Sequence, residues 1–402
     1  MPDLVLGDSL EVLIDHRGKT PKKLGGDFTS GGIPVASAML VHDGRLHLDE
    51  ARFVSPEMFQ RWMPMPTMRH DVLLTSEAPL GRVALVPDDK PLVLGQRLFG
   101  LRGKLGLLDS RFLFYAFQTE AVQAELHGRA TGTTVTGIRQ SELIKLKLSV
   151  PDYPKQQAIS ALLGALDDKI AVNHRIGESA LELAMAKYEG WVDGGRLTCS
   201  VPMAECGRWI SGGTPDTSED SYWRGDIPWI SAASLKSPWI DSSERMVTTL
   251  GAQNGTRLVP AGTVIFVVRG MSLTTEFRIG LTQREVAFGQ DCKALRPCAG
   301  IDPCVLFVAI KSRTPEILLL VDQAGHGTGR LAADLLFKLT LSLPNADFAA
   351  DAAEVLRPLI ALGAARQAEN RTLRELRDAL LPKLMSGQIR VRDVEKVVED
   401  VT

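Results

Sequence analysis

The stretch Gly18-Lys19-Thr20-Pro21 recurs as Gly212-Gly213-Thr214-Pro215, which places Thr20 and Thr214 194 positions apart. The same offset recurs in two further matches. These are Ile33-Pro34-Val35-Ala36-Ser37-Ala38 with Ile227-Pro228-Trp229-Ile230-Ser231-Ala232, and Leu94-Gly95-Gln96 with Phe288-Gly289-Gln290. Three matches at one offset indicate an internal repeat, in which one supersecondary unit occurs twice.

Weaker matches extend the repeat through each copy. They are Asp71-Val72-Leu73-Leu74 with residues 262–266, Gly132-Thr133 with Gly327-Thr328, and residues 146–151 with residues 339–344, which share the pattern Leu-x-Leu-Ser-x-Pro. The last two matches have offsets of 195 and 193. Such slips are expected where loops between shared strands differ in length.

The local pattern changes at a proline in each copy. Before it, short β-type runs such as Val83-Ala84-Leu85-Val86 alternate with turn residues. After Pro151 and Pro344, a stripe recurs at steps of three and four, which is typical of a helix packed against another helix. The stripe positions are Ile159, Leu163, Leu166, Ile170, Asn173, Ile176, Ala180 and Leu183, then Leu356, Ile360, Gly363, Gln367, Asn370, Leu373, Leu376, Leu380 and Leu384.

These patterns predict an α+β chain in which two mixed domains are each followed by a long helix. The expected parts are a first domain (1–150), a central helix (151–193), a second domain (194–344), a distal helix (345–390) and a C-terminal tail (391–402). We expect the helices to pack as an antiparallel coiled coil. A helix over residues 155–191 would be roughly 55 Å long.

Two features of the predicted helices leave alternatives open. Pro358 allows the distal helix to begin either near Asp347 or at the proline itself, since proline suits a first turn and breaks an interior. Asn173 and Asn370 fall on the two stripes, either as a buried polar pair that fixes register or as solvated residues at the stripe edge.

Composition restricts the possible class of protein. The formal net charge of −2 and pI near 6.4 argue against holding nucleic acid by bulk charge, so any such binding must rest on local basic patches. The five cysteines form no Cys-x-x-Cys pair, so we expect no metal site, and scattered thiols suit a reducing cytosol. The first residues lack a signal-peptide pattern, and we expect a cytoplasmic protein that does not enter a membrane.

Motifs of catalysis are missing from the sequence. Residues 128–134 are rich in Gly and Thr but lack the lysine of a phosphate-binding loop. The sequence has no Asn/Asp-Pro-Pro-Tyr/Phe run of an amino-methyltransferase, and its histidines are dispersed. We therefore expect a protein without catalytic residues of its own.

The order of these motifs resembles the specificity subunit of Type I restriction–modification systems. The resemblance is carried by the paired Ile-Pro and Gly-Gln motifs, the strand at Asp71, and the Leu-x-Leu-x-x-Pro strand that ends each copy. It is also carried by Pro151-x-x-Pro154-x-Gln156-Gln157-x-x-Ile159 and by the closing stretch Leu381-Pro382-Lys383-Leu384-Met385-Ser386-Gly387-Gln388-Ile389-Arg390-Val391. The distal helix departs from the pattern, because Pro344-Asn345-Ala346-Asp347-Phe348 lacks the second proline and the two glutamines.

The resemblance implies a pair of target-recognition domains that read the two halves of an asymmetric site in double-stranded DNA. The helices would separate the readers and dock two methyltransferase subunits, with restriction subunits added. S-adenosylmethionine and ATP would bind to those partners and not to this chain. A rod of roughly 55 Å exceeds one turn of B-DNA, about 34 Å, so two readers at its ends would contact separate half-sites.

Side chains suited to DNA contact are Arg and Lys for phosphate and guanine, Asn and Gln for adenine, and small hydroxyls for either. Each candidate can instead be a solvated or ion-paired surface group. The candidates in the first copy are Arg17, Lys19, Thr20, Thr75, Ser76, Arg82, Gln96, Arg97, Thr131, Thr133 and Thr134. Those in the second copy are Thr214, Arg269, Ser272, Arg278, Gln290, Lys293, Thr328 and Arg330. The copies differ most in residues 75–80 against 268–273, which predicts different half-sites.

Two other function classes stay open at this point. One is a nuclease or methyltransferase whose active site is not recognisable in the sequence, in which case the purified chain would cut or modify DNA. The other is a scaffold whose paired domains bind protein, which would show no sequence-dependent affinity for DNA.

Overall fold

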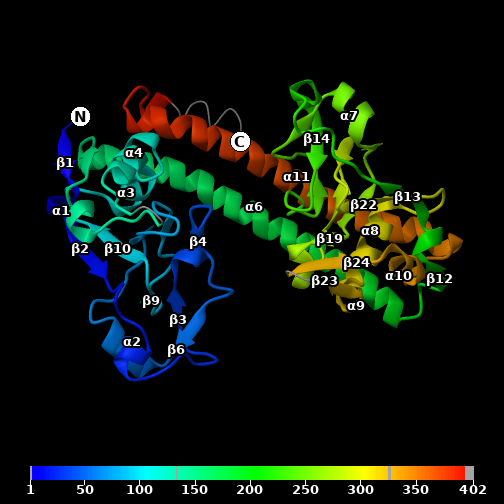
Figure 1. Cartoon of the computed structure of the whole chain (residues 1–402), viewed down its shortest axis with the longest axis horizontal. Coiled ribbons are helices and arrows are strands. Elements are labelled where there is room, and N and C mark those ends of the chain that lie inside the picture. The colour runs from blue at the N-terminus through cyan, green and yellow to red at the C-terminus, as the bar shows by residue number, and fades with distance from the viewer. Residues whose placement is uncertain (1, 133–134, 325–326, 394–402) are drawn as a thin grey trace. The chain divides into compact units, whose positions relative to one another are not determined.

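The computed structural model describes residues 2–132, 135–324 and 327–393. The chain divides into two compact units, one formed by residues 1–168 with 373–402 and the other by residues 169–372 (Figure 1). Two helices, α6 (Tyr153–Asp193) and α11 (Ala346–Met385), each contribute to both units. Thr133, Thr134 and most of the expected tail lie outside the described residues.

The first unit is built on a four-stranded antiparallel sheet with the order β2-β10-β7-β8, beside a three-stranded sheet with the order β6-β3-β9. Its strands are β1 (Asp3–Val5), β2 (Leu10–Asp15), β3 (Ile33–Ala36), β4 (Val41–His42), β5 (Arg45–Leu46), β6 (Arg52–Val54), β7 (Val72–Thr75), β8 (Val83–Leu85), β9 (Val93–Leu94), β10 (Leu98–Gly103) and β11 (Lys147–Ser149). Its shorter helices are α1 (Leu6–Ser9), α2 (Pro56–Trp62), α3 (Ser110–Ala116), α4 (Glu120–Gly128) and α5 (Gln140–Leu143), with 3-10 turns at Lys22–Leu24 and Ala38–Leu40.

The second unit repeats this plan with added strands. Its sheets have the orders β13-β22-β18-β20-β15, β16-β14-β21-β17 and β19-β24-β23. Its strands are β12 (Cys199–Pro202), β13 (Gly207–Ser211), β14 (Trp223–Ile230), β15 (Trp239–Ile240), β16 (Met246–Val247), β17 (Leu258–Val259), β18 (Val264–Val267), β19 (Arg269–Gly270), β20 (Ile279–Thr282), β21 (Val286–Phe288), β22 (Cys292–Pro297), β23 (Val321–Ala324), β24 (Thr328–Leu331) and β25 (Thr340–Leu343). Its shorter helices are α7 (Thr249–Gly255), α8 (Pro303–Ser312), α9 (Thr314–Leu319) and α10 (Ala333–Lys338), with 3-10 turns at Met203–Glu205, Asp220–Tyr222 and Met271–Thr274.

The matches at an offset of 194 form the same parallel strand pair in both units. Val35 lies opposite Val93 between β3 and β9, and Trp229 lies opposite Ala287 between β14 and β21. In each copy, the backbone amide of the glycine after the second strand donates a hydrogen bond to the first strand. Gly95 donates to the Ala36 carbonyl at 2.8 Å, and Gly289 donates to the Ile230 carbonyl at 2.8 Å. A side chain at position 95 would clash, because a Cβ there would lie 2.6 Å from that carbonyl oxygen.

A second shared feature is the start of the helix that follows the main sheet. Asp109 caps α3 by accepting a hydrogen bond from the Phe112 amide at 2.8 Å. Asp302, 193 positions later, caps α8 by accepting one from the Val305 amide at 3.2 Å. A carboxylate at this position satisfies amides that have no partner in the first turn of a helix.

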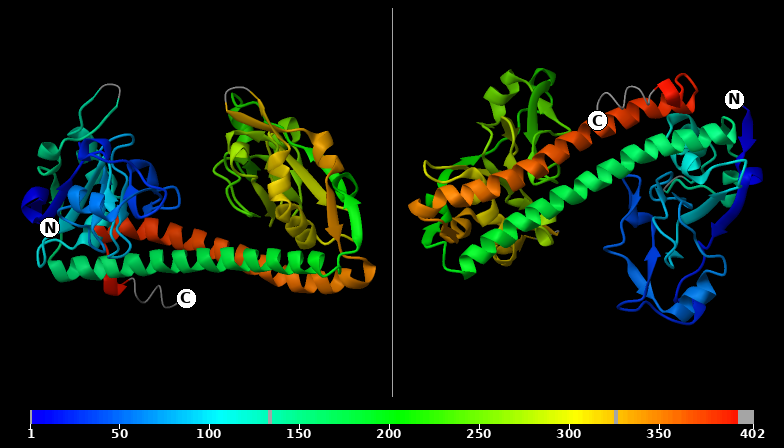
Figure 2. Two further views of the ribbon diagram at one scale, coloured as in Figure 1. Left: turned by 90° about the horizontal axis from the view of Figure 1, so that it is seen from below. Right: turned by 180° about the vertical axis from the view of Figure 1, so that it is seen from behind.

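The two long helices pack antiparallel within each unit, and they lie side by side in both views of Figure 2. In the first unit the Arg377 guanidinium contacts the Asp167 carboxylate at 2.7 Å, and Leu381 and Leu384 join the same apolar core as Ile159 and Leu163. In the second unit Lys169 contacts Glu369 at 3.3 Å. The pairings run in opposite directions along the two helices, as an antiparallel coiled coil requires.

The two stripe asparagines are buried, so neither is a solvated residue at the stripe edge. Asn173 is 1% exposed and Asn370 is 4% exposed. The Asn370 amide nitrogen donates to the Ile170 carbonyl at 3.1 Å, which ties the register of one helix to the backbone of the other. Of the other expected packing residues, Leu163, Leu166, Ile170 and Leu373 are buried, while Leu376 and Leu380 are half-buried.

The prediction that Ile176 packs between the helices is wrong. The Ile176 side chain is exposed, and the neighbouring Gly177 is buried instead. The reason is the Trp239 ring, which packs against both helices at this point. A Cβ on Gly177 would lie 3.3 Å from the ring, and a Cβ on Gly363 would lie 1.9 Å from it. Glycines on both helices therefore make room for a large side chain from the second mixed domain.

The distal helix begins at Ala346 and continues through Pro358, so the start at the proline is excluded. Pro358 is exposed, and the carbonyl that loses its intrahelical partner there can be hydrated. Within the described residues, no helix is long and apolar enough to span a membrane.

The space beside Trp239 gives a test of the packing. The substitution Gly363→Ala should destabilise the chain by about 1–3 kcal/mol, since overpacking against the ring outweighs the gain in helix propensity. Gly190→Ala is the matched control, because this exposed glycine of α6 has no atom within 4 Å of an added Cβ, so it should be neutral or slightly stabilising. Chemical unfolding of both variants measures the difference, and equal stability would contradict the assigned packing.

Candidate nucleic-acid interface

A hollow of about 690 Å³ in the first unit collects several of the predicted contact residues. Lys19 and Thr20 enter it from the loop after β2, and Gln96 and Arg97 enter it from the turn between β9 and β10. The parallel pairing of β3 with β9 brings these segments together, because the Gly-Gln turn follows β9 directly. The hollow is therefore lined by groups that suit phosphate and base edges.

Two of the predicted contact residues are structural instead. Thr75 and Ser76 are buried at the end of β7. The Thr75 hydroxyl donates to the Pro79 carbonyl at 2.6 Å and accepts from the Arg82 amide at 2.8 Å. These bonds shape the loop that follows the strand and leave no exposed hydroxyl for a ligand.

Arg17 is likewise engaged within the protein. Its guanidinium forms two 2.8 Å bonds to the Asp15 carboxylate, donates to the Ile138 carbonyl at 3.0 Å and lies over the Phe99 ring. Burial raises the pKa of Asp15, but its hydrogen bonds and charge interaction with Arg17 outweigh this and lower the pKa overall. Lys19 is also bonded, to the Trp62 carbonyl at 2.8 Å.

Of the remaining candidates that the structure describes in the first unit, Thr20 is half-buried and the others are exposed. Gln96 and Arg97 lie on the rim of the hollow, Arg82 lies nearby after the β7 loop, and Thr131 is exposed. Backbone bridges from Gly137 to both Glu77 and Thr131 hold the Thr131 segment beside that loop. Thr133 and Thr134 are outside the described residues.

The second unit places its counterparts in the same way. The Thr214 hydroxyl donates to the Gln290 side-chain oxygen at 2.8 Å, and Lys293 bonds Ser211 at 2.5 Å. Thr20 and Gln96, the matching pair of the first unit, line one hollow. The repeat thus positions a threonine and a glutamine together twice.

An ion pair occupies matching positions in the two copies with its charges exchanged. In the first unit Glu77 contacts Arg97 at 3.0 Å. The strands β7 and β18 have the same register against β10 and β22, so Arg269 stands where Glu77 does, two residues after the strand. Asp291 stands where Arg97 does, with 4.0 Å between the charged groups of Arg269 and Asp291. The same backbone therefore presents opposite charges at two points of the candidate surface.

Arg269 also lies directly opposite Arg330 between β19 and β24. Like charges in a directly opposed pair destabilise a sheet. Asp322 lies opposite Arg330 on its other side, and Ser272 and Thr328 are half-buried close by in the chain. Arg278 is less available, since it contacts Glu276 at 2.9 Å and donates to the Ala232 carbonyl. The Arg269 and Arg330 pair is suited to an anion such as a phosphate.

Two methionines were not identified from the sequence. Met39 is 81% exposed on the rim of the first hollow, and Met271 is 75% exposed in the turn after β19. Large exposed apolar side chains among polar groups suit contact with thymine methyl groups or base steps. Met271 could have been found from the sequence, because it falls within the segment 268–273, which differs from residues 75–80 of the first copy.

A group of possible metal ligands lies in the first unit. In the part of the chain that the structure describes, one group brings three candidate ligands together, His42, Asp43 and His47, with ligand atoms within 4.8 Å of one another. The two imidazole rings are stacked at 3.7 Å with an interplanar angle of 7°. Ring nitrogens coordinate in the ring plane, so parallel stacked rings do not converge on one ion.

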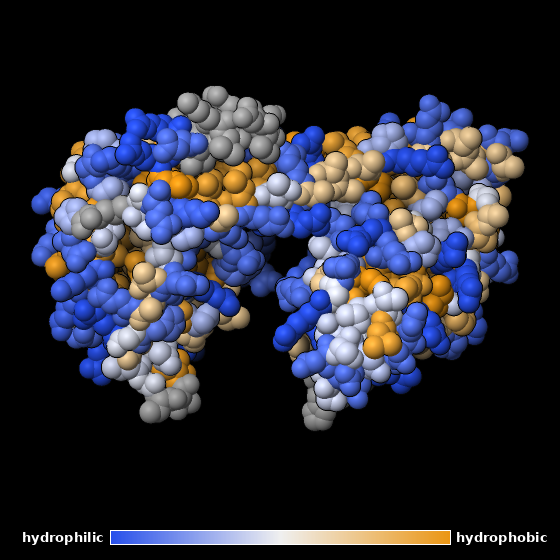
Figure 3. Space-filling model, turned by 90° about the horizontal axis from the view of Figure 1, so that it is seen from above, coloured by the Kyte–Doolittle hydropathy of each residue, from blue (hydrophilic) through white to orange (hydrophobic). Residues whose placement is uncertain are grey.

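The surface of the described residues mixes hydrophilic and hydrophobic groups, and on the face in Figure 3 the hydrophobic residues gather in small groups between hydrophilic ones. The formal net charge of the chain is only −2. Any contact with nucleic acid in this protein therefore depends on the local groups described above.

Comparison with known proteins finds a family model that matches part of the chain. Residues 5–181 match the family model described as Type I restriction modification DNA specificity domain. The chain is 30% identical over 210 residues to the specificity subunit of the Escherichia coli type I restriction enzyme EcoR124I/EcoR124II, a match that covers 50% of this chain and 52% of that one. It thus spans about half the length of that relative.

Two further similarities cover nearly the whole chain. The specificity subunit of the Methanocaldococcus jannaschii type I restriction enzyme MjaIX is 23% identical over 410 residues, covering 94% of this chain and 91% of that one. The crystal structure of the type I restriction–modification S subunit from M. genitalium has the same fold, with a TM-score of 0.57, 17% identity and 95% coverage of both chains. The chain is therefore similar to Type I restriction–modification specificity subunits over nearly its whole length, and it has the fold of one of them.

Proposed function

We propose that this chain recognises a bipartite, asymmetric site in double-stranded DNA, with each copy of the repeat reading one half. It is the non-catalytic subunit of a restriction–methylation complex. One observation carries this proposal. The two copies have the same backbone arrangement but opposite charges at two matching positions, Glu77 and Arg97 in one copy and Arg269 and Asp291 in the other. Two domains with the same backbone and different surface side chains are suited to bind two different short DNA sequences.

The partners follow from the same assignment. The long helices dock two methyltransferase subunits, and restriction subunits complete the complex. S-adenosylmethionine and ATP bind to those partners, and the complex works in the cytoplasm. The match of residues 5–181 to the specificity-domain model and the solvated faces of α6 and α11 support this arrangement.

Exchange of one reader tests the proposal. Replacing residues 1–150 with the corresponding part of a relative of known specificity should change one half of the methylated site and leave the other half unchanged. Methylation sequencing of DNA exposed to the assembled complex reads both halves at once. A change in both halves, or an unchanged site, would refute two independent readers. Failure of the wild-type complex to show any sequence preference would favour a protein-binding scaffold.

The opposed arginines give a second test. Replacing Arg269 and Arg330 together with Ala should weaken DNA binding and lower the salt dependence, with the slope of log K against log salt falling by about 2. The free protein should not lose stability, because removing directly opposed like charges stabilises a sheet by roughly 0.2–1 kcal/mol.

Arg208 and Arg296 provide a matched control, since they are directly opposed between β13 and β22 and are also exposed. Their double replacement with Ala should relieve repulsion in the same way but leave DNA affinity and its salt slope unchanged. If both double variants weaken DNA binding equally, or if neither does, Arg269 and Arg330 do not form a specific phosphate contact.

A further inference from the structure

The junction between each mixed domain and the helix after it is built differently in the two copies. In the first unit Gln156, in the first turn of α6, is buried. Its side-chain oxygen accepts a hydrogen bond from the Asp109 amide at 2.9 Å. Its side-chain nitrogen donates to the Leu107 carbonyl at 3.0 Å and to the Pro151 carbonyl at 2.9 Å. One carboxamide thus satisfies one backbone donor and two backbone acceptors.

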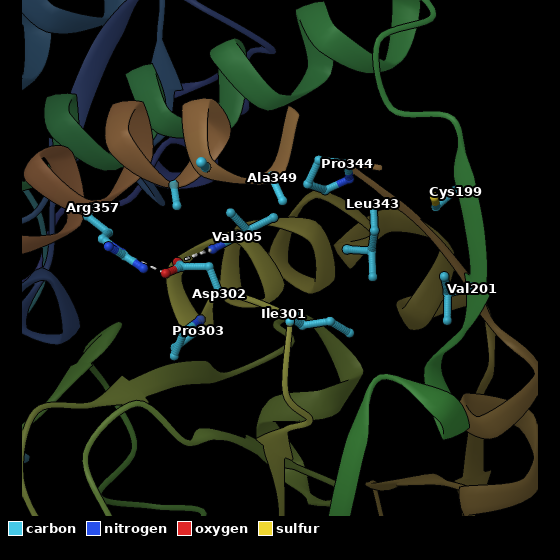
Figure 4. Close-up of a pocket in the computed structure, with 13 residues that line it drawn as sticks. Cys199, Val201, Ile301, Asp302, Pro303, Val305, Leu343, Pro344, Ala349 and Arg357 are labelled. Atoms are coloured by element: carbon cyan, nitrogen blue, oxygen red, sulfur yellow. Dashed lines mark hydrogen bonds and ion pairs between the residues drawn. The ribbon is translucent and has the colours of Figure 1, made fainter. Parts of the chain in front are cut away.

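Ala349 stands at the matching position in the second unit. The offset of 193 that relates the two capping aspartates also relates Gln156 to Ala349, Leu107 to Gly300 and Pro151 to Pro344. Ala349, Gly300, Asp302 and Pro344 all line one hollow of about 480 Å³ (Figure 4). Within the described residues, the structure records no hydrogen bond from the Asp302 amide.

The walls of this hollow fit an aliphatic stem that ends in an amide. Ile301, Val305 and Leu343 supply apolar surface, and they lie around the opening with Ala349 in Figure 4. The Asp302 carboxylate is already engaged, because it accepts from the Cys304 amide at 2.8 Å and contacts Arg357 at 2.6 Å. The backbone groups left for a ligand are a donor at Asp302 and acceptors at Gly300 and Pro344, and the Cys199 thiol and the Arg357 guanidinium also line the hollow.

We infer that this hollow accepts the primary carboxamide of a glutamine or asparagine side chain from a docked methyltransferase subunit. The inference rests on the proposed function, which places that subunit on the long helices. Gln156 in the first copy is the template for the occupant. The second junction is open to a partner side chain where the first is closed by the chain's own residue.

Other ligand chemistries match the three backbone groups less well. A carboxylate can accept from the Asp302 amide but offers no hydrogen to the two carbonyls. An ammonium can donate to the carbonyls but offers no acceptor to the amide. A primary carboxamide provides both, which is why the charge-neutral side chains of Gln and Asn fit this site.

The variant Ala349→Gln tests the inference directly by supplying the carboxamide from the chain itself. It should raise the melting temperature of the full chain by about 3–6 °C, as expected for satisfied buried hydrogen bonds. It should also weaken association with the methyltransferase subunit about tenfold or more, because the partner side chain is displaced. Native mass spectrometry and titration of the partner measure the association.

Two control variants separate hydrogen bonding from bulk. Ala349→Glu has the same size but no amide hydrogens, so it should not raise the melting temperature. Ala365→Gln places the same side chain at an exposed position of α11 that does not line the hollow, and should leave both readouts unchanged. If all three variants behave alike, or if Ala349→Gln assembles as tightly as the wild type, the inference is wrong.

A small-molecule probe tests the wild-type protein without any substitution. Propanamide, which resembles the tip of a glutamine side chain, should compete with the methyltransferase subunit, whereas N,N-dimethylpropanamide and propionate should not. Propanamide that binds without affecting assembly would overturn the partner assignment, and no binding would overturn the carboxamide site. Sequence-specific methylation by the wild-type complex is measured in parallel. If this methylation is present but the carboxamide tests fail, the proposed function stands and only the inference about the hollow is wrong.

Discussion

The parallel pairing of two short strands in each copy organises the candidate recognition surface. The Gly95 amide bonds the Ala36 carbonyl and the Gly289 amide bonds the Ile230 carbonyl, each at 2.8 Å. This contact fixes the Gly-Gln turn beside the main sheet and next to the loop that carries Thr20 or Thr214. Because the pairing is buried and made by backbone groups, the exposed residues around it can vary without loss of the frame.

The two copies differ at surface positions of the mixed domains and at the junctions with the long helices. The ion pair of Glu77 with Arg97 has become that of Arg269 with Asp291, and the buried Gln156 has become Ala349. The capping aspartates and the order of the shared strands have stayed the same, although the second copy has added strands. A duplicated reader thus gains two specificities from changes at its rim, and the helix junctions become unequal as docking points.

The repeat and both long helices could be predicted from the sequence, because they leave repeated and periodic patterns, whereas the pairing of the strands required the structure. The role of Ile176 could not be predicted either, since periodicity gives a face but does not reveal that Trp239 occupies it opposite Gly177 and Gly363. Thr75 was expected at the surface because hydroxyls suit DNA. Its two hydrogen bonds depend on residues 79 and 82, whose positions only the folded loop defines. The departure from Gln at the second junction was visible in the sequence, but the hollow it leaves required the structure.

Methylation sequencing of the native host genome, with and without the gene for this chain, tests the central claim most directly. The account predicts the loss of one split motif, two short defined halves around an unspecified spacer, when the gene is removed. An unchanged methylation pattern in a host that expresses the chain with its methyltransferase would contradict it, as would the loss of a single undivided motif.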